Sequence, residues 1–267
     1  MTEWLIIFIM GSVIGVISAF LGLGGGILIV PILPEVAGIT AKEAIATSLF
    51  TIFLVVANNC YGFHKKKLVI WKIAFVIGPL TAIGAFASGL LVSYLSDGIL
   101  RSILAALVTV FLARAFYGGK KPLPVDSEIV EFVPQKFLGA GLVGIVAGLL
   151  SGISGIGAGL VVSPLLMNLR LAENKKVAPT ANGVMLFTTF FGALAYVSFD
   201  TELNGWVFGY LHLDKALLLA SGAFITSFFA RRQQHKMPAF WRKAALTTLL
   251  GLLTLKMWSE VYQIYFL

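Results

Sequence analysis

The chain has 267 residues, of which 58% are apolar or aromatic and 12% are charged, and its mean hydropathy is +0.94. Soluble domains are about half apolar and about a quarter charged, so this composition excludes a soluble globular domain. It also excludes a disordered protein, because disordered chains are poor in apolar residues. A membrane-spanning helix needs about 20 apolar residues, which leaves room for about eight. We therefore predict an all-α polytopic membrane protein embedded in a lipid bilayer.

The formal net charge of +8 does not indicate a nucleic-acid partner. Lysines and arginines gather in short loops between apolar segments, as is typical of the cytoplasmic loops of membrane proteins. The single cysteine, Cys60, allows no internal disulfide and no thiolate cluster. The three histidines lie at segment ends or in loops. We therefore expect no metal, no cofactor and no nucleic acid.

Eight apolar segments are long enough to span a membrane and two are too short to cross unaided. The long segments are residues 4–21, 44–62, 69–95, 98–117, 137–154, 178–199, 208–230 and 241–260. The short ones, 27–38 and 160–169, each follow a glycine cluster and contain a proline. The long polar stretch at 118–132 predicts a linker. We predict a first transmembrane repeat at 1–117, a cytoplasmic polar linker at 118–135 and a second transmembrane repeat at 136–267.

The chain matches itself when it is shifted by 133 residues. GSVIGVISAFLGLGGGILIVPIL (11–33) aligns with GIVAGLLSGISGIGAGLVVSPLL (144–166), with nine of 23 positions identical. Both copies contain Gly-x-Gly-x-Gly followed five residues later by proline, which a glycine-rich composition alone does not produce in register. The alignment continues through Lys42/Lys175 and Thr47/Thr180. Two related halves are typical of secondary transporters.

The basic residues favour inverted halves. Four crossings in each half would divide the basic residues ten to ten between the two sides. Alternatively, the first apolar segment of each half forms a hairpin with the short segment after it. Sixteen basic residues then lie on one side of the membrane, and only Lys42, Arg101, Lys215 and Lys256 lie on the other. The positive-inside rule favours the second arrangement, with the linker in the cytoplasm and both termini outside it. Re-entrant and fully spanning hairpins both fit, so we predict eight to ten membrane helices.

The glycine clusters at 22–26 and 155–159 predict two broken helices. Irregular backbone at membrane depth is tolerated only inside protein or beside a water-filled cavity. Glycine accommodates positive φ, and the downstream prolines, Pro31 and Pro164, argue for interrupted segments. The short helices would point free N–H groups and their positive dipole ends at the breaks, which together would form an anion site. The spacing of Gly11/Gly15 and Gly144/Gly148 instead predicts close helix packing.

Neutral polar groups, rather than charges, fill the predicted interior. Hydroxyls, amides and backbone N–H groups can replace the water shell of an oxyanion without a counter-charge. Thr47 and Thr180 stand out because they recur in register after the hairpins. The remaining interior polar residues are Ser18, Ser48, Thr51, Asn58, Asn59, Ser151, Ser154, Asn182, Thr188 and Thr189. Arg114, Arg231 and Lys256 lie near segment ends, where we expect them to reach the headgroups.

The segments FLGLGGGILIVPIL and GISGIGAGLVVSPLL resemble the duplicated signature of the TauE/SafE sulfite exporter family, also called the 4-toluene sulfonate uptake permease family. KEAIATSLFTIF, GPLTAIGAFASGLL and the polar linker fit the same pattern, so the resemblance covers essentially the whole chain. It implies a multi-pass permease of the bacterial-type cytoplasmic (inner) membrane that moves sulfur-containing anions such as sulfite, sulfoacetate or sulfonates. It implies a translocation centre at the two glycine clusters and their prolines. Ala158, which aligns with Gly25, is expected to narrow the second break, and Asn182 to alter which anion fits.

We predict a secondary transporter of a small anion that works by alternating access. The predicted substrate-binding residues are Gly22, Gly24, Gly25, Gly26, Pro31, Thr47, Ser48, Thr51, Gly155, Gly157, Gly159, Pro164, Thr180 and Asn182. The sequence contains no Walker-type motif, so we do not expect it to hydrolyse ATP. An anion-selective channel, or a membrane subunit of a larger complex, also fits the repeat. An intramembrane enzyme would need a catalytic set that no span offers. The pattern is compatible with a homodimer.

Overall fold

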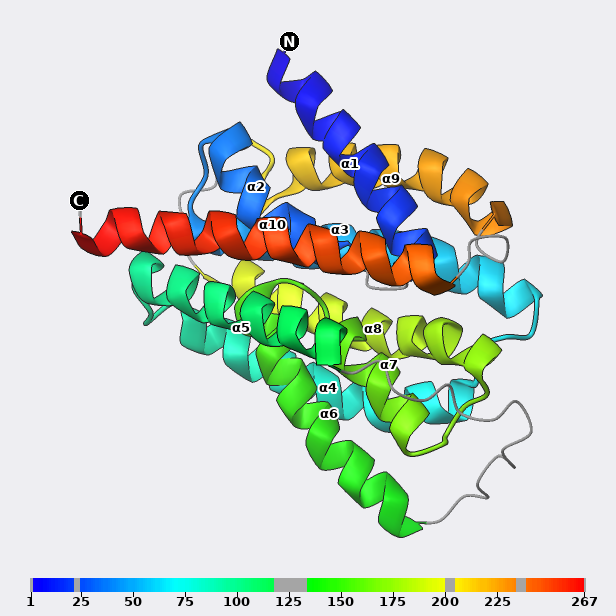
Figure 1. The fold of residues 1–267 in the computed structure, drawn as a ribbon. Coiled ribbons are helices and arrows are strands. Elements are labelled where there is room, and N and C mark those ends of the chain that lie inside the picture. Colours follow the sequence, from blue (N-terminus) through cyan, green and yellow to red (C-terminus); the bar gives the residue numbers. More distant parts are fainter. Residues whose placement is uncertain (1, 22–24, 118–133, 200–204, 234–238, 267) are drawn as a thin grey trace.

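The computed structural model describes residues 2–21, 25–117, 134–199, 205–233 and 239–266, which form ten helices and one β-hairpin (Figure 1). The first helices are α1 (Thr2–Leu21), α2 (Gly26–Ala37), α3 (Ala41–Lys65), α4 (Trp71–Val92) and α5 (Asp97–Tyr117). They are followed by α6 (Pro134–Ser154), α7 (Gly159–Asn168), α8 (Asn174–Val197), β1 (Val207–Phe208), β2 (Leu211–His212), α9 (Leu213–Gln233) and α10 (Ala239–Phe266). Five of them, α3, α4, α5, α8 and α9, are long and apolar enough to cross a membrane. The predicted all-α polytopic membrane fold is confirmed.

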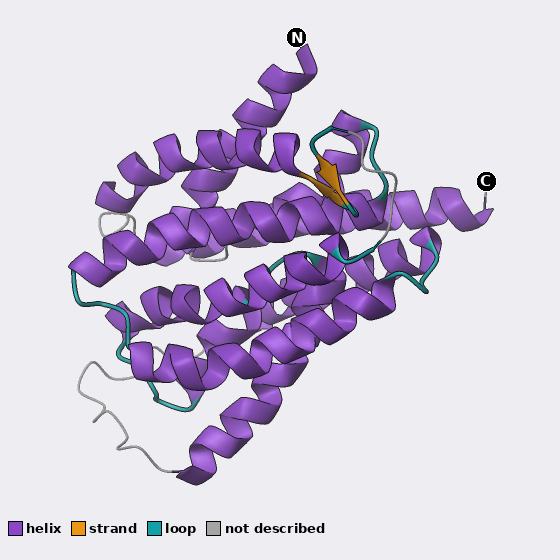
Figure 2. Cartoon of the chain, turned by 180° about the vertical axis from the view of Figure 1, so that it is seen from behind, coloured by secondary structure: helices purple, strands orange, loops and turns teal. Residues whose placement is uncertain are grey.

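Each predicted apolar segment corresponds to a helix, and the two short segments form the short helices α2 and α7. One predicted boundary is wrong, because the span placed at 208–230 begins with the β-hairpin and α9 starts only at Leu213 (Figure 2). Gly209 has a φ of +57°, which permits the tight turn between β1 and β2. The turn packs on the end of α8, where the Tyr210 N–H donates to the Tyr196 carbonyl oxygen at 3.2 Å. The predicted linker is described only from Pro134 onwards, where α6 begins.

Helices α3 and α8 lie side by side at the centre of the bundle and run in opposite directions (Figure 1). Two hydrogen bonds fix this arrangement. Near the start of α3, the Thr47 hydroxyl oxygen accepts the N–H of His212 at 3.2 Å, and His212 belongs to the β-hairpin that packs on the end of α8. Near the start of α8, the Thr180 hydroxyl oxygen accepts the N–H of Ile70, just after α3, at 3.1 Å. Each end of α3 is therefore next to the opposite end of α8.

The other helices pack around this central pair. Helix α4 lies against α6 and α8, α1 lies against α9, and α9 also contacts α3. Helices α5 and α10 pack on one another, with α10 running across the front of the molecule in Figure 1. A side chain at Gly15 would collide with the backbone of Ala223 in α9, and one at Gly148 would collide with the Thr81 carbonyl in α4. The predicted close packing at these equivalent glycines is confirmed.

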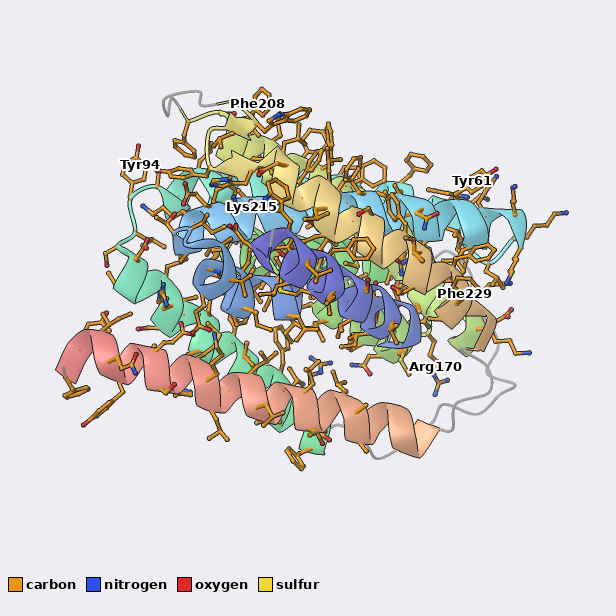
Figure 3. The ribbon with its side chains drawn as sticks, turned by 90° about the horizontal axis from the view of Figure 1, so that it is seen from above. Tyr61, Tyr94, Arg170, Phe208, Lys215 and Phe229 are labelled. Carbon is orange, nitrogen blue, oxygen red and sulfur yellow. The ribbon has the colours of Figure 1, made fainter. Side chains whose placement is uncertain are left out.

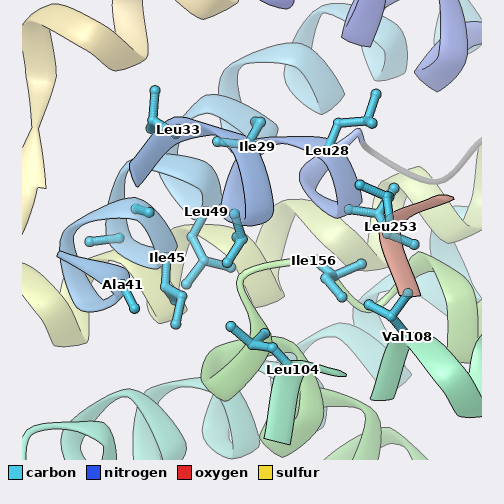
Figure 4. Packing of buried hydrophobic residues seen from close by; sticks show 14 of the residues in the cluster. Leu28, Ile29, Leu33, Ala41, Ile45, Leu49, Leu104, Val108, Ile156 and Leu253 are labelled. Atoms are coloured by element: carbon cyan, nitrogen blue, oxygen red, sulfur yellow. The ribbon is translucent and has the colours of Figure 1, made fainter. Parts of the chain in front are cut away.

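The largest apolar cluster joins the short helix α2 to its surroundings. Figure 4 shows Leu28 and Ile29 of α2 together with residues of α3, α5 and α10. Ile156, from the second glycine cluster, belongs to the same group and is 2% exposed. The breaks therefore lie inside the packed bundle, as irregular backbone in a membrane protein must.

Candidate functional site

Both glycine clusters interrupt the helix, as the sequence predicts. Helix α1 ends at Leu21 and α2 begins at Gly26, while α6 ends at Ser154 and α7 begins at Gly159. Gly25, Gly155 and Gly157 have φ values of +83°, +65° and +87°, a region of backbone conformation that favours glycine. The predicted site residues Gly22 and Gly24 lie outside the described residues.

The two breaks touch one another. A side chain at Gly26 would collide with the Gly155 carbonyl oxygen, and its Cβ would lie 2.9 Å from the Ile156 Cα. The Ser48 hydroxyl, from α3, donates to the same Gly155 carbonyl oxygen at 2.7 Å. A Cβ atom added at Gly155 would in turn lie 2.8 Å from the Cγ2 of Val30 in α2. The first turn of α2 thus rests directly on the break of the other half.

Each break leads into a buried helix N-terminus that has no side-chain cap. The N-cap residues are Gly25 for α2 and Ala158 for α7, and neither helix start receives a side-chain hydrogen bond. Ala158 has a φ of −72°, so its methyl group causes no backbone strain at this position. Gly26 and Gly159 are also buried. Buried helix starts need hydrogen-bond acceptors for their first N–H groups, and an anion is a suitable one.

Two serines one turn before the breaks have the chemistry to complete such a site. Ser18 and Ser151 are repeat-equivalent, each is 2% exposed, and neither hydroxyl has a hydrogen-bond partner among the described residues. The sequence shows both as interior polar residues, but the predicted site omits them. Their recurrence in register is the same signal that singles out Thr47 and Thr180. A buried hydroxyl without a partner is costly, which suggests that a ligand supplies one.

The predicted site residue Asn182 lies buried in α8, where its amide nitrogen donates to the Ala178 carbonyl at 2.7 Å. Its side-chain oxygen has no partner among the described residues, and the same is true of Asn59 in α3. The neighbouring residue on the same face of α8, Met185, packs against Gly157. Asn182 therefore lies one turn of α8 before a residue that contacts the second break.

Three predicted site threonines have hydrogen bonds to other parts of the protein. Thr47 and Thr180 accept the N–H groups described above, at the starts of α9 and α4, and so join one half of the chain to the other. The Thr51 hydroxyl donates to the Thr47 carbonyl of its own helix at 2.7 Å. These hydroxyl groups hold helices together, and their place in the binding site stays a prediction.

Pro31 marks the place where α2 is attached to α10. Its carbonyl oxygen accepts a hydrogen bond from the Lys256 ammonium group, which also lies 2.9 Å from Glu35 and 2.9 Å from Glu260. Glu260 binds Arg101 of α5 at 2.6 Å. The expected contact of Lys256 with the headgroups stays a prediction; in the structure its ammonium group binds the protein, and α10 continues for ten more residues. Pro164, the equivalent of Pro31, is only half-buried.

Charged loops gather at opposite ends of the bundle. The Ile70–Thr180 bond places the loop with Lys65, Lys66 and Lys67 next to the start of α8 with Lys175 and Lys176. At the other end, the His212 Nε2 lies 3.2 Å from Glu43. Figure 3 shows Tyr61 and Arg170 toward one end and Tyr94 and Phe208 toward the other.

Comparison with known proteins gives a family match over nearly the whole chain. The family described as Sulfite exporter TauE/SafE matches residues 7–257. A probable membrane transporter protein of Methanocaldococcus jannaschii is 30% identical over 258 residues, covering 94% of each chain. A probable membrane transporter protein of Haemophilus influenzae is 27% identical, covering 89% of this chain and 90% of the relative. Another from Bacillus subtilis is 27% identical, covering 83% and 85%. No solved structure matches the chain.

Proposed function

This chain belongs to the Sulfite exporter TauE/SafE family of membrane transporters, and from that premise we propose that it is a secondary transporter of a small oxyanion. The proposed substrate is of the sulfite, sulfoacetate or sulfonate type. The anion binds at the paired helix breaks, and two inverted halves carry it across the cytoplasmic membrane by alternating access.

The contact between the two breaks is the observation that carries the proposal. Gly26, the first residue of α2, meets Gly155, which directly follows α6, and the starts of α2 and α7 are both buried without a side-chain cap. Each start offers N–H groups and a positive dipole end, which favour negative charge. A single anion between them would accept hydrogen bonds from both halves.

The serine hydroxyls support an oxyanion as the occupant. Ser18 and Ser151 can each donate one hydrogen bond to the substrate, whose oxygens accept several. They and the backbone N–H groups are neutral, so they bind an anion without a fixed counter-charge that would hold it too tightly to release. We include Gly25, Gly157, Gly159 and Asn182 in the proposed site because they form or adjoin the breaks.

The helix arrangement supports two inverted halves at 1–117 and 136–267. The repeat-equivalent helices α3 and α8 are antiparallel, and so are α5 and α10, because Arg101 near the start of α5 binds Glu260 near the end of α10. The packing of α1 on α9 has its counterpart in the packing of α6 on α4. With the basic loops in the cytoplasm, both termini and Lys42 are on the opposite side.

Uptake into proteoliposomes tests the function. The purified chain is expected to take up labelled sulfite or sulfoacetate with saturation, and to exchange it in counterflow. Ser18→Ala combined with Ser151→Ala should weaken uptake, whereas Ser102→Ala should not, since the Ser102 hydroxyl bonds only its own helix at Gly98. Uptake equal to that of empty vesicles for both anions would refute the proposal. Ohmic, non-saturating flux would favour the anion-selective channel.

A further inference from the structure

Two of the apolar side chains that lie against the breaks are a repeat-equivalent pair. Ile52 of α3 and Met185 of α8 are separated by the repeat shift of 133 residues, and both are completely buried. Together with Val56 and Cys60 they form a small cluster of their own, distinct from the larger one around α2.

Ile52 touches both breaks. Its Cδ1 lies where a side chain on Gly26 would have to be, and it is 3.7 Å from the Cβ position of Gly157. The Met185 Cε lies 2.9 Å from the same position on Gly157. The methyl ends of these two side chains therefore cover the inner faces of the first turn of α2 and of the second break.

We propose that Ile52 and Met185 determine the size of the anion that the site accepts, an inference that rests on the proposed function. An anion that accepts N–H groups from α2 and α7 has to lie against the glycines that these side chains cover. Ile52 is β-branched and conformationally restricted, so it forms the fixed wall. Met185 is unbranched and adaptable, so it yields to larger substituents.

The test measures competition in proteoliposomes that contain the full chain. The labelled substrate is sulfite or sulfoacetate, whichever the protein takes up. Unlabelled methanesulfonate, ethanesulfonate and benzenesulfonate are added as competitors. The measured quantity is the ratio of the half-inhibitory concentrations of benzenesulfonate and methanesulfonate. Ile52→Ala is expected to lower this ratio about tenfold or more, because size discrimination by an apolar pocket is of that order per methylene. Met185→Ala should lower it less, since methionine already adapts.

Controls separate the site from general loss of packing. Ile7→Ala in α1 and Met257→Ala in α10 remove similarly buried side chains that are not among the nearest neighbours of the described break glycines, and they should leave the ratio unchanged. Ile52→Val removes one methylene, keeps the fold and should change the ratio by about fourfold. An unchanged ratio in Ile52→Val and in the folded alanine variants, with normal wild-type uptake, overturns the size filter alone. Absence of uptake by the wild type overturns the proposed function and the filter with it.

Discussion

The short helices α2 and α7 are equivalent in sequence but are attached to the bundle in different ways. Helix α2 is bound to α10 through Lys256, which contacts the Pro31 carbonyl and Glu35. Helix α7 has no charged side chain, and among the described residues it packs mainly on α8 and less on α6. The difference shows that two repeat-equivalent breaks can keep the same glycines while the helices that follow them are held by different contacts. It leads us to expect that α2 is the fixed side of the site and α7 the moving side.

The largest expected effect comes from the contact between the breaks. Gly26→Ala would place a methyl group on the Gly155 carbonyl and push α2 away from the second break. We expect uptake to fall about 100-fold, because displacements of about 1 Å in a preorganised site have effects of that size. Gly251→Ala is the control, since a side chain there meets open space in the described structure. Near-normal uptake by Gly26→Ala would show that the two breaks need not touch.

The attachment of α2 gives the next largest effect. Lys256→Met removes the ammonium group from Pro31, Glu35 and Glu260, and it should lower the free energy of unfolding by about 1–2 kcal/mol. Because α2 would lose its orientation at the site, the rate of uptake should also fall about tenfold. Thermal unfolding in detergent and uptake in vesicles measure the two effects. Lys72→Met, an exposed lysine on α4, should change neither. If Lys256→Met transports normally, α2 and α7 are equally free and the contrast between them fails.

The serines sharpen the comparison between the two copies. Ser18→Ala and Ser151→Ala each remove one donor, worth about 1 kcal/mol, so each should raise the half-saturating anion concentration about fivefold. Equal effects would mean that both halves bind the anion alike. A large effect at Ser18 and none at Ser151 would assign binding to the fixed side. No effect at either position contradicts a role for these hydroxyls in binding.

The smallest effect is expected at the threonines that join the halves. Thr47→Val and Thr180→Val each leave a backbone N–H without its acceptor, which should cost about 1 kcal/mol of unfolding free energy. The half-saturating anion concentration should stay unchanged, because both hydroxyls are engaged in the hydrogen bonds that join the two halves. Comparison of the two unfolding midpoints tests whether these equivalent hydrogen bonds are equally strong. A raised half-saturating concentration would place the threonine in the binding site.

Much of the fold could be predicted from local features of the sequence. The apolar segments correspond to the helices, and both short helices begin at the last glycine of their cluster. The β-hairpin at 207–212 escaped prediction because its residues are as apolar as the start of a span, and only Gly209 indicates the turn. The sequence pattern does not show that the Lys256 ammonium group binds Pro31 and Glu35 of α2, because that contact depends on how α10 packs on α2.

The site could be predicted only in part. The glycines were identified because a broken helix requires them at the break itself. Ser48, Thr47 and Thr51 lie within one and a half turns of α3, yet among the hydrogen bonds of the described residues only that of Ser48 goes to the second break. The sequence does not distinguish them, since the face of α3 that meets Gly155 depends on how the helices pack. Ile52 and Met185 look like ordinary core residues for the same reason.

By itself, the sequence determined the membrane class, the helices, the two breaks and the repeat that relates them. These follow from local physics, since hydrophobic length, glycine and proline act on their own segment of chain. The tertiary structure alone decided that Gly26 rests on Gly155, that each threonine of the repeat binds the opposite half, and that Lys256 supports only α2. Those contacts join residues a hundred or more positions apart, and their geometry arises from the packing of whole helices.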